Sequence, residues 1–403
     1  MNIDTIDLTD QDVFVEGVPH DWFATLRREA PVYWHPEPDG GPGFWCVTRY
    51  PDVVTVNRDN QTFSSARGAV FMWDLEPDQL EQQRLMMLNM DPPMHTRYRR
   101  LVNKGFTPRM MTELEATVRE RTRSILDKVT PRGTCDFVTD VAAELPLQVI
   151  ADLLGVPQDD RHKMFDWSNR MVGSEDPEYA VSAEEAQLAS MELFAYAAQL
   201  AEMKRADPGN DLISVLSEAE VDGERLSQLE IDLFFMLLTV AGNETTRNQI
   251  SHGMLAFLEH PDELARLRER PELLSSAIEE MLRYASPVMH FRRTATQDLT
   301  LGDTAIAEGD KVVIWYASAN RDESVFDDPM RFDISRSPNE HVAFGGGGPH
   351  FCLGANLARL EIRVMFEELL PRWSDLALAG EPQRLRSNFI NGIKHLPLSF
   401  TPA

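Results

Sequence analysis

The apolar positions of this chain follow helical spacing over most of its length, and strand-like runs are confined to shorter regions. Apolar residues recur every three or four positions between residues 77 and 284, with interruptions at the prolines of positions 92, 108, 131, 157 and 208. β-branched or alternating runs fall at about 30–66, 286–318 and 385–400, and a further amphipathic helix at about 353–370. The pattern predicts a mainly α protein with small peripheral sheets, in one domain over residues 1–403.

Local signals refine this prediction. A short helix is expected over residues 21–29, and strands over 44–48, 298–301 and 311–315. Residues 320–344 are rich in Asp, Pro and Arg and predict an irregular segment. The pair Asn391-Gly392 predicts a hairpin-like turn near the end of the chain. No internal repeat divides the sequence.

A long central helix is the clearest single element. Ser227 and Glu230 form a capping box ahead of an apolar run that Pro261 ends. These roughly 34 residues would span about 50 Å at 1.5 Å per residue. Because the run is apolar nearly all round, we expect the helix to lie in a core.

The middle of that helix departs from its own pattern. Gly242 and two threonines weaken a helix, and Asn243 and Glu244 are costly to bury without partners. Such an inconsistency in a buried element favours a functional site at Ala241–Thr246. The structural alternative is a packing kink at Gly242.

Composition narrows the class of protein. The 403 residues carry a formal net charge of −26, which argues against nucleic acid and anionic membranes as partners. The chain contains no apolar run of about 18 residues or more, so no membrane span is expected. Its acidic first ten residues do not resemble a signal peptide. Three scattered cysteines make no disulfide framework, so a reducing cytoplasm is expected.

One cysteine stands apart. Cys352 ends a glycine-rich loop that begins at Phe344, and a predicted amphipathic helix follows it. A thiolate at a helix N-terminus is stabilised by the dipole and by free N–H groups, so it can ligate iron. Such a donating axial thiolate is what haem needs for O–O cleavage. The alternatives are a buried inert cysteine or a glycine-rich anion loop.

Two further pairs have helical spacing. Glu280 and Arg283 lie three positions apart on one helix face. His95 and Arg99 lie one turn apart and could together bind a carboxylate, or they could form a surface cluster.

These motifs, in this order and spacing, resemble the cytochrome P-450 superfamily of haem-thiolate monooxygenases over essentially the whole chain. The resemblance implies haem b (iron protoporphyrin IX), with Cys352 as the iron ligand. The residues that it implies around the haem are His95, Arg99, Ala241, Gly242, Arg293, Phe344, His350, Cys352 and Gly354. It makes Glu280, Arg283 and Arg336 a structural ion cluster rather than a catalytic one.

The loop from Phe344 to Cys352 spans eight positions, one more than the common family loop. The longer loop and the sequences around Gly242 and Asn388 resemble a bacterial subgroup that oxidises the ends of sterol side chains and of methyl-branched lipids. The expected substrate is therefore a steroid-like or other apolar lipid, with a terpenoid or branched fatty acid as the alternative. The residues expected to line its site are Val70, Met72, Leu88, Leu237, Val240, Ala241, Val288, Met289, Phe389 and Ile390. Segments 70–73 and 86–88 are expected to form a lid.

By the same resemblance, Thr245 and Glu244 deliver protons for the reduction of O2. Electrons must come from a separate protein, because no G-x-G-x-x-G unit indicates a fused nicotinamide domain. A ferredoxin with its reductase is the expected donor, docking on the basic stretch 92–112. The alternative is that some of these basic side chains, including Arg99, only neutralise the haem carboxylates. The protein is expected to be a monomer. A peroxygenase or a non-catalytic haem carrier is disfavoured, because neither needs the Glu244–Thr245 pair.

Overall fold

The structure is a computed structural model that describes residues 1–103, 106, 108–172, 176–179, 182–221 and 223–403. It is mainly helical with small sheets, as the sequence predicts. The chain divides into two compact units. The first comprises Met1–Thr96, Glu279–Cys352 and Ser387–Asn391, and the second Arg97–Ile278, Leu353–Arg386 and Gly392–Ala403. The single domain stays a prediction.

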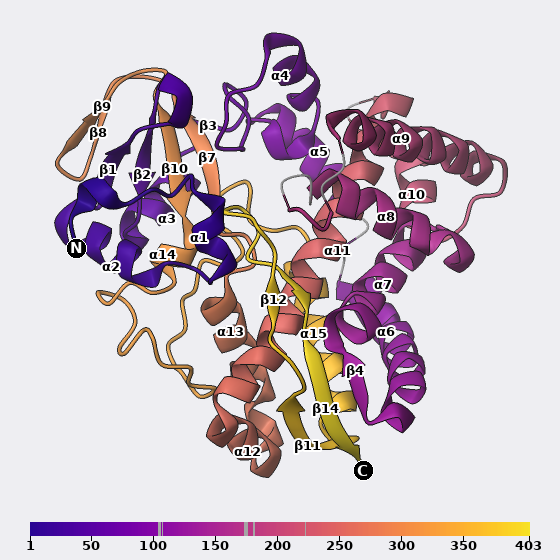
Figure 1. Ribbon diagram of the computed structural model, residues 1–403. Coiled ribbons are helices and arrows are strands. Elements are labelled where there is room, and N and C mark those ends of the chain that lie inside the picture. The colour runs from indigo at the N-terminus through magenta and orange to yellow at the C-terminus, as the bar shows by residue number, and fades with distance from the viewer. Residues whose placement is uncertain (104–105, 107, 173–175, 180–181, 222) are drawn as a thin grey trace. The chain divides into compact units, whose positions relative to one another are not determined.

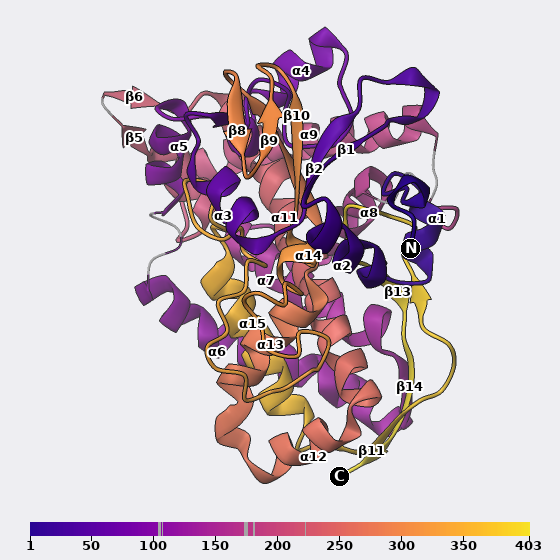
Figure 2. The same cartoon turned by 90° about the vertical axis from the view of Figure 1, so that its left-hand side faces the viewer.

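A five-stranded sheet organises the first unit (Figure 2). Its spatial order is β1 (Val32–His35), β2 (Phe44–Val47), β10 (Lys311–Trp315), β7 (His290–Ala295) and β3 (Phe63–Ser64). The β2–β10 pair is parallel and the other pairs are antiparallel. A separate hairpin joins β8 (Leu299–Leu301) to β9 (Thr304–Ile306).

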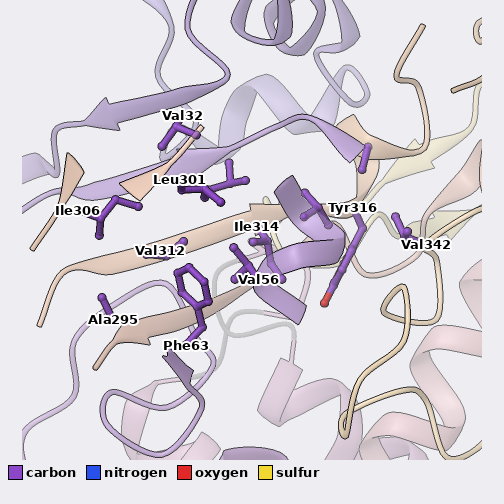
Figure 3. Packing of buried hydrophobic residues seen from close by; sticks show 13 residues of the cluster. Val32, Val56, Phe63, Ala295, Leu301, Ile306, Val312, Ile314, Tyr316 and Val342 are labelled. Atoms are coloured by element: carbon purple, nitrogen blue, oxygen red, sulfur yellow. The ribbon is translucent and has the colours of Figure 1, made fainter. Parts of the chain in front are cut away.

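Both faces of this sheet are buried, which β10 illustrates. Val312 and Ile314 lie in one apolar cluster with residues of β8, β9 and α3 (Figure 3). Val313 and Trp315, which point the other way, lie in a second cluster with the N-terminal segment. Because alternate side chains enter opposite clusters, the register of β10 fixes which residues of the neighbouring β7 face each side.

The helices of the first unit are short. They are α1 (Gln11–Val15), α2 (His20–Glu29), α3 (Tyr50–Arg58), α4 (Pro77–Gln83) and α14 (Tyr316–Ala319), while α5 (Met94–Val102) and α13 (Leu274–Ala285) belong partly to each unit. Residues 320–344 contain neither helix nor strand, which confirms the predicted irregular segment.

The second unit is a helical assembly around α11 (Gln228–Glu259). Its other helices are α6 (Pro108–Val129), α7 (Glu144–Leu154), α8 (Arg161–Val172), α9 (Ala183–Ala206), α10 (Leu212–Glu218), α12 (Pro261–Glu269) and α15 (Ala355–Leu369). Helices α7, α8, α9 and α15 all pack against α11 (Figure 1). The predicted capping box of Ser227 and Glu230 is confirmed, and the helix ends at Glu259, with His260 as its C-cap directly before Pro261.

Two local predictions were wrong. β4 (Thr134–Asp136) interrupts the region predicted to be helical, because it pairs with the distant β14 (Pro397–Pro402), which also pairs with β11 (Trp373–Leu378). Asn391-Gly392 does not form a two-residue hairpin turn. It lies at the end of an eight-residue connection between β12 (Gln383–Arg384) and β13 (Ile393–His395), and Gly392 is not among the residues with positive φ.

Besides the β8–β9 and β12–β13 pairs, β5 (Glu220–Val221) pairs with β6 (Glu224–Arg225).

None of the helices in the described ranges is long and apolar enough to cross a membrane.

Candidate active site

The cysteine loop is shaped by four consecutive glycines. Gly345, Gly346, Gly347 and Gly348 all have positive φ, a conformation that other residues adopt only with strain. A Cβ on Gly348 would lie 2.3 Å from the Asn57 carbonyl oxygen, so the loop can pack here against α3 only as glycine. The Cys352 amide donates to the Phe344 carbonyl at 3.0 Å and closes the loop.

Cys352 is also the cysteine best suited to bind a metal. It is exposed, whereas Cys46 and Cys135 are buried. Burial raises the pKa of Cys135 to about 12 and that of Cys46 further, so both remain thiols at neutral pH. Cys352 therefore lies where its sulfur can be reached by iron.

Two predicted imidazoles lie together in the first unit. The ring centroids of His95 and His350 are 4.2 Å apart, and the ring of His350 hydrogen-bonds through Nε2 to the Met90 carbonyl at 3.0 Å. His95 is buried on α5, one turn before Arg99, which is half-buried. The pairing of His95 with His350 across about 250 residues of sequence supports a shared role in binding one group.

Arg293 is a fully buried cation on β7. Its Nη1 donates to the Arg292 carbonyl at 2.8 Å, and its Nη2 donates to Asn57 Oδ1 at 3.5 Å. Burial lowers the pKa of Arg293. No carboxylate among the described residues forms an ion pair with it, so an anionic group from a ligand suits this position.

These donors fit a haem. An accessible sulfur suits its iron, and the buried guanidinium suits one of its carboxylates. The structure adds Asn57, which sequence reasoning missed: it contacts Arg293, packs against Gly348, and its Oδ1 accepts from the Tyr316 hydroxyl at 3.0 Å. No local sequence signal marks it, because all three contacts are long-range.

Helix α11 has one open stripe in an otherwise buried surface. Between positions 231 and 257 every residue is buried except Met236, Leu237, Val240, Ala241, Gly242 and Thr245. Leu237, Val240, Ala241 and Thr245 share one face by their spacing, and Met236 and Gly242 lie to either side of it. Apart from Gly242 and Thr245 they are apolar, and the Thr245 hydroxyl donates to the Ala241 carbonyl at 2.8 Å. This stripe offers an apolar wall with a single hydroxyl.

Gly242 has a packing role. A Cβ on it would lie 2.9 Å from Ile150 Cδ1, so its absence lets α7 approach α11 closely. The helix continues through Gly242 without a break.

Glu244 lies one turn after Val240 on α11, but unlike the residues of the stripe it is enclosed. It is buried, and its carboxylate forms an ion pair with Arg247, three positions later on α11. The Ser168 hydroxyl of α8 donates to Glu244 Oε1 at 3.4 Å. Arg247 has no role predicted from the sequence beyond its place in the segment that resembles the subgroup, although its i, i+3 spacing from Glu244 indicates a possible ion pair.

The predicted substrate residues of the first unit fall into two groups. Val288 and Ile390 form a β-bridge, and the Met289 amide donates to the Phe389 carbonyl at 2.9 Å. Residues 389–390 therefore lie against the segment directly before β7. Met289 and Met72 are buried in the apolar cluster around Trp315.

The expected lid segment is attached to the sheet. Val70 is buried, and its carbonyl accepts from the Arg292 amide at 2.8 Å. The Val70 amide donates to Asn89 Oδ1 at 3.1 Å. Leu88 is half-buried in the short turn Met87–Asn89.

The structural ion cluster is present as predicted. Arg283 Nε and Nη2 donate to the two carboxylate oxygens of Glu280, each at 2.8 Å, and Arg336 Nε donates to the same carboxylate at 3.1–3.2 Å. Glu280 and Arg283 have no exposed side-chain surface. Burial alone would raise the pKa of Glu280, but the hydrogen bonds and charge of Arg283 outweigh it and the pKa is lowered.

Of the predicted basic stretch, Arg97, Arg99 and Arg100 lie on α5. Lys104 lies outside the described residues, and for Arg109 only the backbone is described, within α6.

Known proteins place this architecture in a family. A family model for cytochrome P450 matches residues 39–391. The chain is 46% identical over 98% of its length to a steroid C26-monooxygenase of Rhodococcus jostii, covering 85% of that protein. It is also 46% identical over 94% of its length to a methyl-branched lipid omega-hydroxylase of Mycobacterium tuberculosis, covering 90% of that protein.

Among solved structures, a cytochrome P450 of Mycobacterium marinum in complex with pseudoionone superposes with a TM-score of 0.92, at 41% identity, over 99% of both chains. The chain therefore belongs to the cytochrome P450 family and is a P450 monooxygenase. Membership implies a haem-iron cofactor and, as is typical of the bacterial members, a redox partner.

Proposed function

We propose that this P450 hydroxylates an apolar lipid at or near the end of a long chain, with a steroid side chain as the preferred substrate. The observation that carries the proposal is the near-equal similarity to a steroid C26-monooxygenase and to a methyl-branched lipid omega-hydroxylase, both named for oxidation at a chain terminus. The apolar stripe of α11 agrees with such a substrate.

Energetics favour a large apolar ligand on this surface. Burying about 300 Å² of apolar surface contributes about 7 kcal/mol, which supports micromolar binding after the entropic costs of association. A small polar metabolite gains no comparable energy from Leu237, Val240 and Ala241. A terpenoid or branched fatty acid is the second candidate, and the pseudoionone complex of the M. marinum relative favours keeping it.

The haem of this proposal is haem b, held by Cys352 through its iron. Arg293, Arg99, His95 and His350 would bind its carboxylates, and the surroundings would include Phe344, Gly354, Ala241 and Gly242. When bound, the haem supplies dioxygen activation and C–H oxidation.

The residues of this chain would orient the substrate and supply protons for the reaction. Thr245 offers the only hydroxyl on the α11 stripe and can hold a proton at Oγ1. Glu244 follows Gly242 and Asn243 on the same helix and can carry protons inward as a carboxyl relay. The stripe, together with Val70, Met72, Leu88, Val288, Met289, Phe389 and Ile390, would orient the substrate and exclude water.

The proposed electron donor is a ferredoxin that docks on Arg97 and Arg100 of α5, because Arg99 is proposed to bind a haem carboxylate. The support is chemical: Arg97, Arg99 and Arg100 form a basic segment in a chain with net charge −26, and an acidic partner would be steered to it.

The testing experiment is a spin-shift titration of the haem-loaded enzyme. Cholestenone, pseudoionone and a methyl-branched fatty acid are compared with a compact polar compound. We expect micromolar high-spin shifts with the lipids and the tightest with cholestenone. Leu237→Trp should weaken the shift, whereas Leu229→Trp, at an exposed site of the same helix, should not. A shift with the polar compound alone would contradict the proposed substrate class.

A further inference from the structure

Residues 68–74 lie in the connection between β3 and α4, and two of them, Val70 and Met72, are among those proposed to contact the substrate. The segment has neither helix nor strand of its own. Connections of this kind are usually the more mobile parts of a fold, and a lid is expected here from the sequence. The contacts of the segment instead attach it to the five-stranded sheet.

Arg292 of β7 is the centre of this attachment. Its side chain is 4% exposed, and its backbone amide donates to the Val70 carbonyl at 2.8 Å. Its Nη1 donates to the Trp73 carbonyl at 3.3 Å and to Asp74 Oδ1 at 2.7 Å. One residue of the sheet therefore holds the segment both at Val70 and at its end.

Lys311 of β10 adds a second buried cation. Its Nζ donates to Asp74 Oδ2 at 2.9 Å and also to the Glu37 carboxylate. Burial alone would raise the pKa of Asp74, but the hydrogen bonds and charges of Lys311 and Arg292 outweigh it and the pKa is lowered. Asp74 is therefore a carboxylate at neutral pH, and its two oxygens are bound by cations from the neighbouring strands β10 and β7.

The start of the segment is held by packing. A Cβ on Gly68 would lie 2.8 Å from Arg292 Cζ and 2.8 Å from Thr294 Oγ1, so any larger residue at this position would displace the guanidinium. Ala69 follows with φ +62°, a left-handed conformation that alanine adopts only with strain. Such a backbone persists only where the surrounding contacts fix it.

Helix α4, which begins three residues after Asp74, is not held in this way. None of its residues, all of which the structure describes, is buried. Segments with few buried contacts open more readily than segments that are bound on several sides. The firmly held part of this connection is therefore residues 68–74, and α4 is an internal comparison.

The held segment also carries Phe71, whose ring centroid lies 5.7 Å from that of Phe389 in the tail. Phe389 is likewise proposed to contact the substrate, and both rings belong to the first unit. Because side chains pack closely, a wall that is fixed restricts where a bound chain can lie. A shift of the reacting carbon by about 1 Å changes the rate of its oxidation strongly.

We infer that Arg292 is a positioning residue that, together with Lys311, holds residues 68–74 against the sheet as a fixed wall of the substrate site, and that this wall determines which carbon of the lipid is oxidised. This inference rests on the proposed function, because the wall matters for the reaction only if Val70 and Met72 contact the substrate. The segment then stays in place during substrate entry instead of opening as a lid.

The first measurement needs no turnover. Amide hydrogen exchange of the haem-loaded enzyme is compared among the wild type, Arg292→Met, Arg292→Lys and Arg67→Ala. We expect residues 68–74 to exchange about 10-fold faster in Arg292→Met, because the charged hydrogen bonds to Trp73 and Asp74 are lost. Arg292→Lys should restore part of the protection, and exchange in α4 should not change.

Arg67→Ala is the matched control, because Arg67 lies in the same connection and its side chain forms an exposed pair with Glu308 instead. It should exchange as the wild type does. Equal exchange of residues 68–74 in Arg292→Met and in the wild type would overturn the inference.

The second measurement is the distribution of oxidised positions, with ferredoxin, reductase and a methyl-branched fatty acid or cholestenone. We expect the share of product oxidised away from the chain end to rise by about 3-fold to 10-fold in Arg292→Met. Asp74→Asn, at an exposed side chain, should change the distribution in the same direction but less, and Arg67→Ala should not change it. An unchanged distribution in Arg292→Met, despite faster exchange, would overturn the role in selecting the carbon.

Two further outcomes separate this inference from its neighbours. The reduced carbon monoxide spectrum should match the wild type in every variant, because the Arg292 side chain is not proposed to bind the haem. A changed spectrum would place the effect at the haem and would contradict the inference. If the wild type does not oxidise these lipids at the chain end, the proposed function fails, while hydrogen exchange still decides whether Arg292 holds the segment.

Discussion

The Cys352 amide donates a hydrogen bond to the Phe344 carbonyl across an eight-position loop. The four glycines between them all adopt positive φ, so the loop is built of backbone turns that only glycine makes without strain. The cysteine is therefore presented at an exposed position next to the start of α15.

We expect Gly348→Ala to disrupt this loop. An added Cβ costs about 1–3 kcal/mol in backbone strain at φ +82°, and it would also meet the Asn57 carbonyl at 2.3 Å. The thiolate spectrum should weaken and the Tm should fall. Gly309→Ala is the control, because φ is +91° there but nothing lies within 4 Å of a Cβ. Equal effects of the two substitutions would show that the close packing on Asn57 is unimportant.

Arg283→Ala should destabilise the protein by about 3–5 kcal/mol, because it leaves Glu280 buried without its main partner. Urea unfolding at pH 7 measures the loss. Arg270→Ala breaks an exposed pair with Glu272 and should cost less than about 1 kcal/mol. A small loss at Arg283 would mean that the other donors to the Glu280 carboxylate, which are Arg336, Asn339 Nδ2 and the Asp333 amide, satisfy it without Arg283.

The same cluster predicts an acid limit to stability. The folded-state pKa of Glu280 lies below its ordinary value of 4.5, so its contribution is complete above that value. That contribution is lost as the pH falls through the lowered folded-state pKa, when the carboxylate must be protonated. The free energy of unfolding, measured between pH 6 and pH 3 (about the range in which carboxyls titrate), should fall more steeply in the wild type than in Glu280→Gln. Parallel curves would contradict this.

Thr245→Ala should lower the amount of product formed per NADH rather than abolish NADH consumption. Electron uptake does not involve the α11 stripe, so NADH consumption continues, while loss of the hydroxyl lowers product and raises hydrogen peroxide. Counting NADH, product and peroxide together measures this. Thr246→Ala, at the buried neighbouring position, is the comparison. An unchanged ratio of product to NADH in Thr245→Ala would mean that another group, and not the Thr245 hydroxyl, delivers the proton.

The elements that sequence reasoning located are those encoded locally. The two ends of α11 are set by signals that lie beside them in the sequence, the capping box at Ser227 and Glu230 and the stop at Pro261, and the structure agrees. The Glu280–Arg283 pair was also visible, because helical spacing places both on one face.

What sequence reasoning missed depends on distant partners. The packing of Gly242 on Ile150 and the pairing of β4 with β14 arise only when separate segments meet. Asn391-Gly392 has the composition of a tight turn, but the pairing of β12 with β13 sets a longer connection. The enclosure of Arg247 requires α8, so its spacing from Glu244 could not reveal burial.

The central claim is that Cys352 binds the haem iron as a thiolate. The most direct measurement is the absorption spectrum of the reduced carbon monoxide complex of Cys352→Ser and Cys352→His beside the wild type. The account predicts a strongly red-shifted Soret band in the wild type that is absent in both variants, since neither a hydroxyl nor an imidazole donates charge as a thiolate does. A variant that keeps the wild-type spectrum would contradict the assignment and point to Cys46 or Cys135 as the ligand.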